Sequence, residues 1–171
     1  MNENNAPLVI LISGTPGVGK TTIGTLLKKK GYSVIALNDF ILFNGLYYGY
    51  DHFRGSVILD VEFLKKELRT QIINYSNLLF IEGHTTEYVP KQLVSLIFVI
   101  KCNPRILRKR LIARGYLKRK IEENIQAEIM EECLLRHREN FPEKIIIELD
   151  SSDIKPEEIV NEIMKSIDNI S

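Results

Sequence analysis

The chain has 171 residues, of which 44% are hydrophobic and 26% charged, a balance typical of one folded domain and unlike that of disordered or collagen-like chains. Its 23 basic and 22 acidic side chains give a formal net charge of +1, so no overall positive field would hold the protein on a polyanion such as RNA. The two cysteines, Cys102 and Cys133, lie far apart, which argues against a disulfide framework or a CxxC zinc site.

The first residues, MNENNAP, lack the basic start and the apolar core of a secretion signal. The longest apolar runs, such as 8–12 and 96–100, are far shorter than the ~20 residues that span a bilayer. We therefore expect a soluble protein of the cytoplasm, or also of the nucleus if the source is eukaryotic.

Short apolar runs alternate along the chain with longer stretches of helical period, which indicates an α/β domain with a parallel sheet. Runs rich in branched residues and ended by polar or turn residues are predicted to be strands. All of them are expected to be central or nearly central in the sheet. The predicted strands are 9–13, 33–37, 78–82, 96–101 and 145–149.

Helical periodicity fills the intervals between these strands. The first helix begins at Lys20, and Gly31 stands at its end, where a left-handed cap is common. The second begins behind Asp60, whose carboxylate is suited to cap free amides, and runs over about 61–74. The third opens with the Asn-Pro pair at 103–104, a good cap followed by the residue best tolerated at the first helical position.

The last third of the chain carries two apolar stripes, and packing in the core is enough to explain both of them. One long charged helix is predicted from 118 to about 140. The last helix begins near Pro156, where proline and acidic residues suit the positive start of a helix. The stripe of the long helix consists of Ile121, Ile125, Ile129 and Met130, and that of the last helix consists of Ile159, Ile163 and Ile167.

A phosphate-binding loop is predicted between the first strand and the first helix. Residues 14–21, GTPGVGKT, match the pattern G-x-x-x-x-G-K-[ST] in the context that the motif requires. Glycines let successive backbone N–H groups point into one concavity that fits an anion. The Lys20 ammonium should reach the β- and γ-phosphates, and the Thr21 hydroxyl should bind Mg²⁺. The motif therefore predicts ATP or GTP binding by Gly14, Gly17, Val18, Gly19, Lys20 and Thr21.

The segment after the second strand is predicted to bind a ligand. Asn38 and Asp39 follow this strand at the carboxyl edge of the sheet, where open α/β folds bind ligands. Tyr47, Tyr48 and Tyr50 are suited to stack on a purine, as aromatic faces do with any base. The alternative for each tyrosine is a place in a hydrophobic flap that packs on its own core.

The strand at 78–82 ends in Glu82, where a Walker B strand usually ends in the aspartate that anchors magnesium. Glu82 should reach the metal through water or orient an attacking water. His84 is predicted to position water for hydrolysis or to move a proton. A histidine that only hydrogen-bonds at the strand end is the alternative.

Arg110 and Arg114 are four residues apart, so they share one helix face. Guanidinium groups suit the charge that develops on a transferring phosphoryl group, and both arginines are predicted to be catalytic, Arg114 first. Gly115 ends the helix and is suited to hinge a lid. The neighbouring basic residues are expected to form a solvated face: Arg105, Arg108, Lys109 and 118–120.

The chain resembles the atypical adenylate kinases called adenylate kinase isoenzyme six, or coilin-interacting nuclear ATPase, including their archaeal members. The resemblance runs from Leu8 to about Glu128 and is carried by GTPGVGKTT, LNDFILFNGLYYGYD, FIEGHTTEYVP and RLIARGYLKRKIEENIQAEI. It implies one domain with a three-layer P-loop fold, parallel strand order 2-3-1-4-5, a monophosphate-binding arm over about 36–59 and a short lid over about 113–123. It also implies that Thr22 contacts ATP and that Arg114 closes over it.

The activity that this resemblance implies is that of a broad-specificity nucleoside monophosphate kinase with ATP and Mg²⁺, converting ATP and AMP to two ADP, with ATP hydrolysis as a side activity. It further implies a part in late maturation of the small ribosomal subunit, with the S-eleven ribosomal protein as partner and transient contact with pre-ribosomal RNA. Two alternatives stay open. One is an assembly ATPase switched by its nucleotide, and the other is a P-loop kinase of another small molecule such as shikimate or a sugar.

Overall fold

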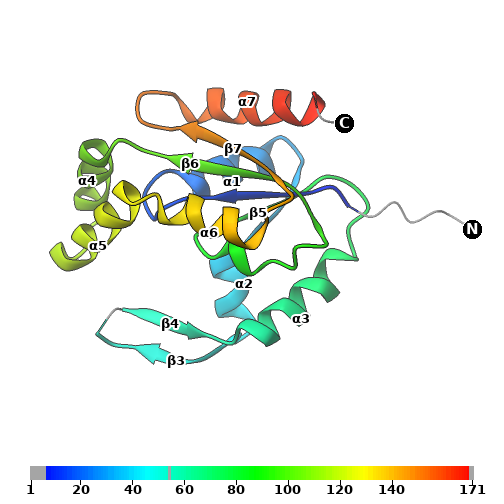
Figure 1. The fold of residues 1–171 in the computed structure, drawn as a ribbon, viewed down its shortest axis with the longest axis horizontal. Coiled ribbons are helices and arrows are strands. Elements are labelled where there is room, and N and C mark those ends of the chain that lie inside the picture. The colour runs from blue at the N-terminus through cyan, green and yellow to red at the C-terminus, as the bar shows by residue number, and fades with distance from the viewer. Residues whose placement is uncertain (1–6, 54, 170–171) are drawn as a thin grey trace, which may run out of the picture.

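The computed structural model describes residues 7–53 and 55–169 (Figure 1). Five parallel strands form the main sheet in the order β2-β5-β1-β6-β7, which confirms the predicted order. β2 and β7 are its edges, so the expectation that all five strands are central or nearly central is wrong for these two. The strands are β1 (Val9–Ser13), β2 (Ser33–Ala36), β5 (Leu79–Glu82), β6 (Val94–Lys101) and β7 (Ile145–Asp150).

Alternate residues of the central strands point to opposite faces of the sheet, and each face has its own apolar core. Ile10 and Ile12 belong to the core under α1 (Lys20–Lys29), α4 (Pro104–Ala113), α5 (Lys118–Ile129) and α7 (Pro156–Asp168). Val9 and Leu11 belong to the core under α2 (Leu37–Phe43), α3 (Val61–Ile72) and α6 (Glu132–Asn140). Figure 1 shows α7 on one side of the sheet and α2 and α3 on the other. These are the three layers that the resemblance implied.

Several helix ends are formed by the residues predicted to form them. The Asp60 carboxylate accepts a hydrogen bond from Phe63 N at 3.0 Å, and Asn103 Oδ1 accepts one from Arg105 N at 2.9 Å. Gly31 takes the left-handed conformation, with φ of 92°. Each cap satisfies a backbone group that the helix itself leaves unpaired, so the helix begins or ends at these points.

The single helix predicted over 118–140 is wrong. The chain breaks into α5 and α6 at Glu131, which has φ of 51° although it is not glycine. The Glu131 carboxylate bonds to Lys101 Nζ at the end of β6, which helps to hold the turn. Ile121 and Ile125 are buried as predicted, but Ile129 and Met130 are 63% and 58% exposed because the stripe ends with α5.

The segment between β2 and α3 forms a projecting arm. After α2 it continues as an antiparallel hairpin of β3 (Tyr47–Asp51) and β4 (Ser56–Leu59), which extends away from the main sheet in Figure 1. The three tyrosines of the arm, Tyr47, Tyr48 and Tyr50, are each at least 40% exposed, so they do not pack into a core of their own.

Within the described residues, no helix combines the length and the apolar character that crossing a membrane requires.

Candidate functional site

The candidate site lies at the carboxyl edge of the sheet, where the loop from β1 to α1 meets the end of β5. Strand pairing brings Ile12 opposite Glu82 and Ala36 opposite Glu82, so β1, β2 and β5 end together. The P-loop and the start of the arm leave the sheet at this edge. This is the place where parallel α/β sheets bind ligands.

The P-loop (residues 14–19) depends on glycine at two positions in different ways. Gly14 has φ of 139°, and a Cβ atom there would lie 2.3 Å from the carbonyl oxygen of Ile100, so no side chain fits. Gly19 has φ of 112° and open space around it, so it needs glycine for its backbone conformation alone. The loop thus follows a path that other residues would block or strain.

Lys20 is buried at the start of α1, and its ammonium turns back into the P-loop. Lys20 Nζ donates hydrogen bonds to Gly14 O at 2.6 Å and to Thr15 O at 3.0 Å. Burial lowers the pKa of Lys20 from 10.5 to about 8, although the nearby Glu82 and Glu128 oppose this change. A cation that is poorly solvated and held by two carbonyl groups is ready to exchange them for phosphate oxygens.

The affinity for ATP is therefore expected to fall as the pH rises above about 8. The phosphates of ATP stabilise the charged form of Lys20. Below this pKa Lys20 is already charged, whereas above it Lys20 must take up a proton when ATP binds. Calorimetry should show binding roughly tenfold weaker at pH 9 than at pH 7.5, with proton uptake at the higher pH. A wild-type affinity that stays constant from pH 7.5 to 9.5 would contradict this role of Lys20.

Glu82 ends β5 as a buried carboxyl group beside Lys20 and Thr21. Burial raises the pKa of Glu82, while the Lys20 charge and a hydrogen bond from Thr21 lower it and the Asp39 charge raises it. The structure thus brings four predicted residues into one electrostatic neighbourhood: Lys20, Thr21, Asp39 and Glu82. Thr21 and Asp39 are exposed, as are Thr22 and Asn38, so their side chains are accessible to a ligand.

Gly24, inside α1, leaves the space that the Glu82 side chain occupies. A Cβ atom at position 24 would lie 3.2 Å from Glu82 Cγ and 3.5 Å from Val34 Cγ1. Sequence reasoning missed this residue, because a lone glycine in a helix carries no signal of what packs against it.

Gly24→Ala is expected to lower ATP turnover several-fold. Alanine should stabilise the helix by roughly 1 kcal/mol, but its methyl group displaces the Glu82 carboxylate, so most of that gain should be lost. Urea unfolding and steady-state ATP turnover measure the two effects. A full gain in stability with unchanged turnover would show that α1 does not position Glu82.

His84 follows Glu82 and the turn at Gly83. Desolvation by the surrounding protein, together with repulsion from Lys20, Lys120 and Arg136, lowers the pKa of His84 to about 4, although the residue is exposed. The imidazole is therefore neutral near pH 7 and retains a nitrogen lone pair that a water molecule can use. Lys120 belongs to α5, so this helix reaches the vicinity of His84.

The two predicted catalytic arginines have different surroundings. Arg114 is the exposed C-cap residue of α4, and its charge contributes to the lowered pKa of Lys20, which places it within electrostatic range of the P-loop. Gly115, with φ of 73°, forms the expected turn after it. Arg110 instead donates to Val18 O, to Ser151 Oγ and to the carbonyl oxygens of Ser151 and Ser152. Within the described part of the chain it is bonded to protein and not turned toward Arg114.

The tip of the arm meets the segment predicted to be the lid. Arg119 Cζ of α5 lies 3.5 Å from the centroid of the Phe53 ring, a cation–π contact across the gap between the two elements. One salt bridge, from Arg108 of α4 to Glu122, holds α5 at this place, and Arg119 also pairs with Glu123 four residues later in the same helix. The predicted lid and the arm therefore touch at this contact, and Tyr50 is an exposed residue of β3 in the same arm.

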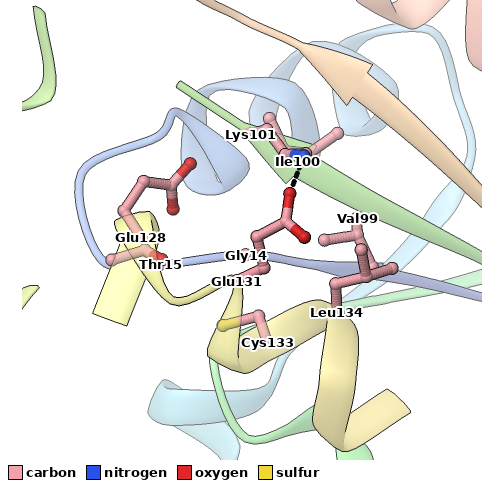
Figure 2. Close-up of a pocket in the computed structure, with 9 residues that line it drawn as sticks. All are labelled: Gly14, Thr15, Val99, Ile100, Lys101, Glu128, Glu131, Cys133 and Leu134. Atoms are coloured by element: carbon pink, nitrogen blue, oxygen red, sulfur yellow. Dashed lines mark hydrogen bonds and ion pairs between the residues drawn. The ribbon is translucent and has the colours of Figure 1, made fainter. Parts of the chain in front are cut away.

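A buried polar cluster on the other side of the P-loop was not predicted. His137 Nδ1 lies 2.6 Å from Cys133 O, which only accepts, so Nδ1 carries the proton and Nε2 accepts from Thr86 Oγ1 at 2.9 Å. Glu128, Glu131 and Cys133 from the α5–α6 segment line one pocket with Gly14 and Thr15, and in Figure 2 the Glu131 side chain points to Lys101. No local sequence signal reveals this contact, because α6 is far from the P-loop in the chain.

The chain is similar in sequence to known proteins. A family model described as an AAA domain matches residues 10–131. A protein of Methanococcus maripaludis named "Putative adenylate kinase" is 35% identical over 167 residues, covering 94% of this chain and 89% of the relative. A protein of Pyrococcus abyssi with the same name is 38% identical over 162 residues, covering 92% of this chain and 82% of the relative.

Solved structures share the fold at low identity. The shikimate kinase from Bacteroides thetaiotaomicron has a TM-score of 0.58 and 16% identity, covering 94% of this chain and 98% of its own. A gluconokinase from Sinorhizobium meliloti has a TM-score of 0.56 and 15% identity, covering 97% of this chain and 94% of its own. The fold is therefore that of P-loop kinases.

Proposed function

Because the chain belongs to the AAA domain family and to the family of archaeal proteins named "Putative adenylate kinase", we propose that it is a nucleotide kinase that transfers a phosphoryl group from ATP to a nucleoside monophosphate. The observation that carries the proposal is the Lys20 ammonium inside a glycine-lined loop. Glu82 and Arg114 lie within electrostatic range of Lys20, and Asp39 lies within electrostatic range of Glu82. That arrangement suits a triphosphate on one side and an acceptor under the arm.

The P-loop would hold ATP through its backbone N–H groups and Lys20. Lys20 exchanges Gly14 O and Thr15 O for phosphate oxygens, and so carries its charge to the group that is transferred. Arg114, at the turn into the lid, closes from the other side and stabilises the charge that develops on that group. The P-loop glycines, Lys20 and Arg114 would position the phosphates of ATP and supply positive charge. No covalent intermediate with the protein is needed.

Thr21 and Glu82 are the residues that would hold Mg²⁺. Among the described residues no group of three or more His, Cys, Asp or Glu side chains is arranged for a metal ion. One hydroxyl and one carboxyl group fit Mg²⁺ nonetheless, because in nucleotide sites this ion keeps several waters and takes its other ligands from phosphates. When bound, Mg²⁺ neutralises phosphate charge.

The acceptor would lie between the arm and α5. Asn38, Asp39 and Tyr50 border this space, and the Arg119–Phe53 contact joins its two walls. Closure at this contact excludes water, so that the acceptor rather than water receives the phosphoryl group. Water in place of the acceptor would give the proposed ATPase side activity.

His84→Ala is expected to lower acceptor-independent ATP hydrolysis by roughly 10²-fold, the size of one positioned general base. The neutral imidazole beside Glu82 is the group suited to orient water. Phosphoryl transfer to AMP should fall by much less, since AMP brings its own nucleophile. An assay of phosphate release without acceptor measures the first effect, and equal hydrolysis in variant and wild type would remove this role of His84.

A panel of acceptors tests the proposed reaction against a P-loop kinase of another small molecule. ADP formation from ATP is followed with AMP, CMP, shikimate, gluconate or no acceptor. The proposal predicts that a nucleoside monophosphate stimulates ADP formation most. Stimulation by shikimate or gluconate alone would contradict it, and turnover that no acceptor changes would favour an assembly ATPase.

The finer placement in the isoenzyme-six branch is part of the same proposal and rests on the resemblance of segments 80–90 and 110–129. With it come a part in late maturation of the small ribosomal subunit, an S-eleven ribosomal protein as partner and transient contact with pre-ribosomal RNA. Capture of that ribosomal protein in the presence of ATP or ADP tests this, and binding that is absent or indifferent to nucleotide counts against it.

A further inference from the structure

A serine far along the chain holds one peptide group of the P-loop in place. Ser151, in the loop after β7, lies 133 residues from Val18, yet its Oγ is 2.7 Å from Val18 O. The same Oγ is 3.0 Å from Lys101 O, so its one proton goes to the nearer carbonyl, that of Val18. Ser151 N donates to Lys101 O at 2.8 Å, and the residue is 4% exposed, so the hydroxyl has little freedom to move.

Arg110 completes this contact from α4. Arg110 Nη1 donates to Ser151 Oγ at 3.1 Å, and more weakly to Val18 O at 3.4 Å, while Nη2 donates to Ser151 O at 2.6 Å and Ser152 O at 3.3 Å. Because Ser151 Oγ accepts from the guanidinium, its own proton is left for Val18 O. Four contacts to protein oxygens use most of the five N–H donors of arginine.

The Val18 carbonyl and the Gly19 N–H belong to one planar peptide group and point in opposite directions. Holding Val18 O on the side of Ser151 therefore turns the Gly19 N–H the other way, away from Ser151. Gly19 has φ of 112° and carries no side chain, so the peptide before it is less restricted than it would be before another residue. The hydrogen bonds to Val18 O from outside the loop therefore help to fix its direction.

We propose that Ser151 and Arg110 are positioning residues that lock the Val18–Gly19 peptide so that the Gly19 N–H faces the phosphates of a bound nucleotide. The proposal rests on the proposed function in that it takes the P-loop to bind a polyphosphate. It gives Arg110 a role in binding through the backbone, in place of the predicted direct contact with the transferring group.

Ser151→Ala tests the lock, with Ser152→Ala as the matched control. The Ser152 hydroxyl bonds to Asp150 and accepts from Asn103 N at 2.7 Å, but it does not contact the P-loop. Calorimetry with ATP and with inorganic tripolyphosphate measures the affinity of wild type and both variants. Ser151→Ala should weaken both ligands by the same factor, roughly three- to tenfold, which is the range of one neutral hydrogen bond. Ser152→Ala should stay within about twofold of wild type.

Two further readouts separate the lock from general loss of structure. The amide ¹H–¹⁵N signal of Gly19 in nucleotide-free protein should shift or broaden in Ser151→Ala and not in Ser152→Ala. Arg110→Lys keeps the charge but loses the fork, so it should also weaken tripolyphosphate. Unchanged tripolyphosphate affinity in Ser151→Ala, an equal loss in Ser152→Ala, or an Arg110→Lys variant that loses kcat alone would overturn the proposal.

Failure of the proposed function would look different. If the wild-type protein binds tripolyphosphate but transfers nothing to AMP, the proposed kinase activity is contradicted. The affinities of the variants for tripolyphosphate can still be compared in that case, so the role of Ser151 and Arg110 is still tested. A wild-type protein that binds no polyphosphate overturns both.

Discussion

Lys20→Met is expected to reduce phosphoryl transfer from ATP by roughly 10²–10³-fold, the loss typical when a preorganised donor to a developing charge is removed. Lys20 is the buried cation at the centre of the P-loop, bonded to Gly14 O and Thr15 O. Methionine has a similar length and no charge, so it keeps the packing and removes the interaction with phosphate. Steady-state ADP formation with saturating AMP measures the loss.

The stability of this variant shows whether the loss is chemical. Burial disfavours the charged form of Lys20, since its pKa falls from 10.5 to about 8, so replacing it with methionine should not destabilise the fold greatly. Lys29→Met, an exposed change on the same helix, is the matched control and should keep wild-type activity. Equal activity of Lys20→Met and Lys29→Met would refute the role assigned to the P-loop.

Arg114→Ala is expected to lower kcat by about 10³-fold, the lower end of the effect of an arginine that stabilises a transferring phosphoryl group. The KM for ATP should change by less than about fivefold, because the arginine acts mainly on charge that develops in the transition state. It lies at the end of α4, next to the turn at Gly115, where it would move with the proposed lid. Initial rates over a matrix of ATP and AMP concentrations separate the two constants.

Arg105→Ala provides the control for charge. Arg105 lies on α4 as an exposed residue, and its removal lowers the positive charge of the same helix by the same amount. It should leave kcat within about twofold of wild type, as expected of a solvated surface charge. If Arg114→Ala raised KM tenfold and left kcat unchanged, Arg114 would be a binding residue only.

Sequence patterns predicted the parts of the fold that depend on neighbours in the chain. The phosphate loop, the Asp60 and Asn103 caps and the Gly31 turn are each formed by residues a few positions apart. The apolar runs predicted the sheet for the same reason, since a strand buried on both faces must be apolar throughout.

The break at Glu131 could not be predicted, because no glycine or proline marks it. Glu131 takes a left-handed conformation that is uncommon for its type, and its carboxylate is held by Lys101, thirty residues earlier. The charged pattern of α5 continues smoothly into α6, so periodicity alone gives one long helix. A contact distant in sequence decided the local structure.

The sequence predicted which residues lie near the P-loop, but it could not predict where each of their side chains points. Lys20, Thr21, Asp39 and Glu82 lie in one neighbourhood, as their places at strand ends suggested. Spacing put Arg110 and Arg114 on one helix face, but it could not show that Ser151 and Ser152 engage the Arg110 guanidinium. Side chains of the β7–α7 loop come beside α4 only once the sheet has formed.

Transfer of the γ-phosphoryl group to AMP decides whether the protein is a nucleotide kinase. ATP labelled in the γ position is incubated with the protein, Mg²⁺ and AMP, and the labelled products are separated. The label is expected to appear in ADP formed from AMP, and Lys20→Met is expected to lower the rate of its formation by roughly 10²–10³-fold. Label that appears only as inorganic phosphate, at a rate that AMP does not change, would contradict the proposed kinase activity.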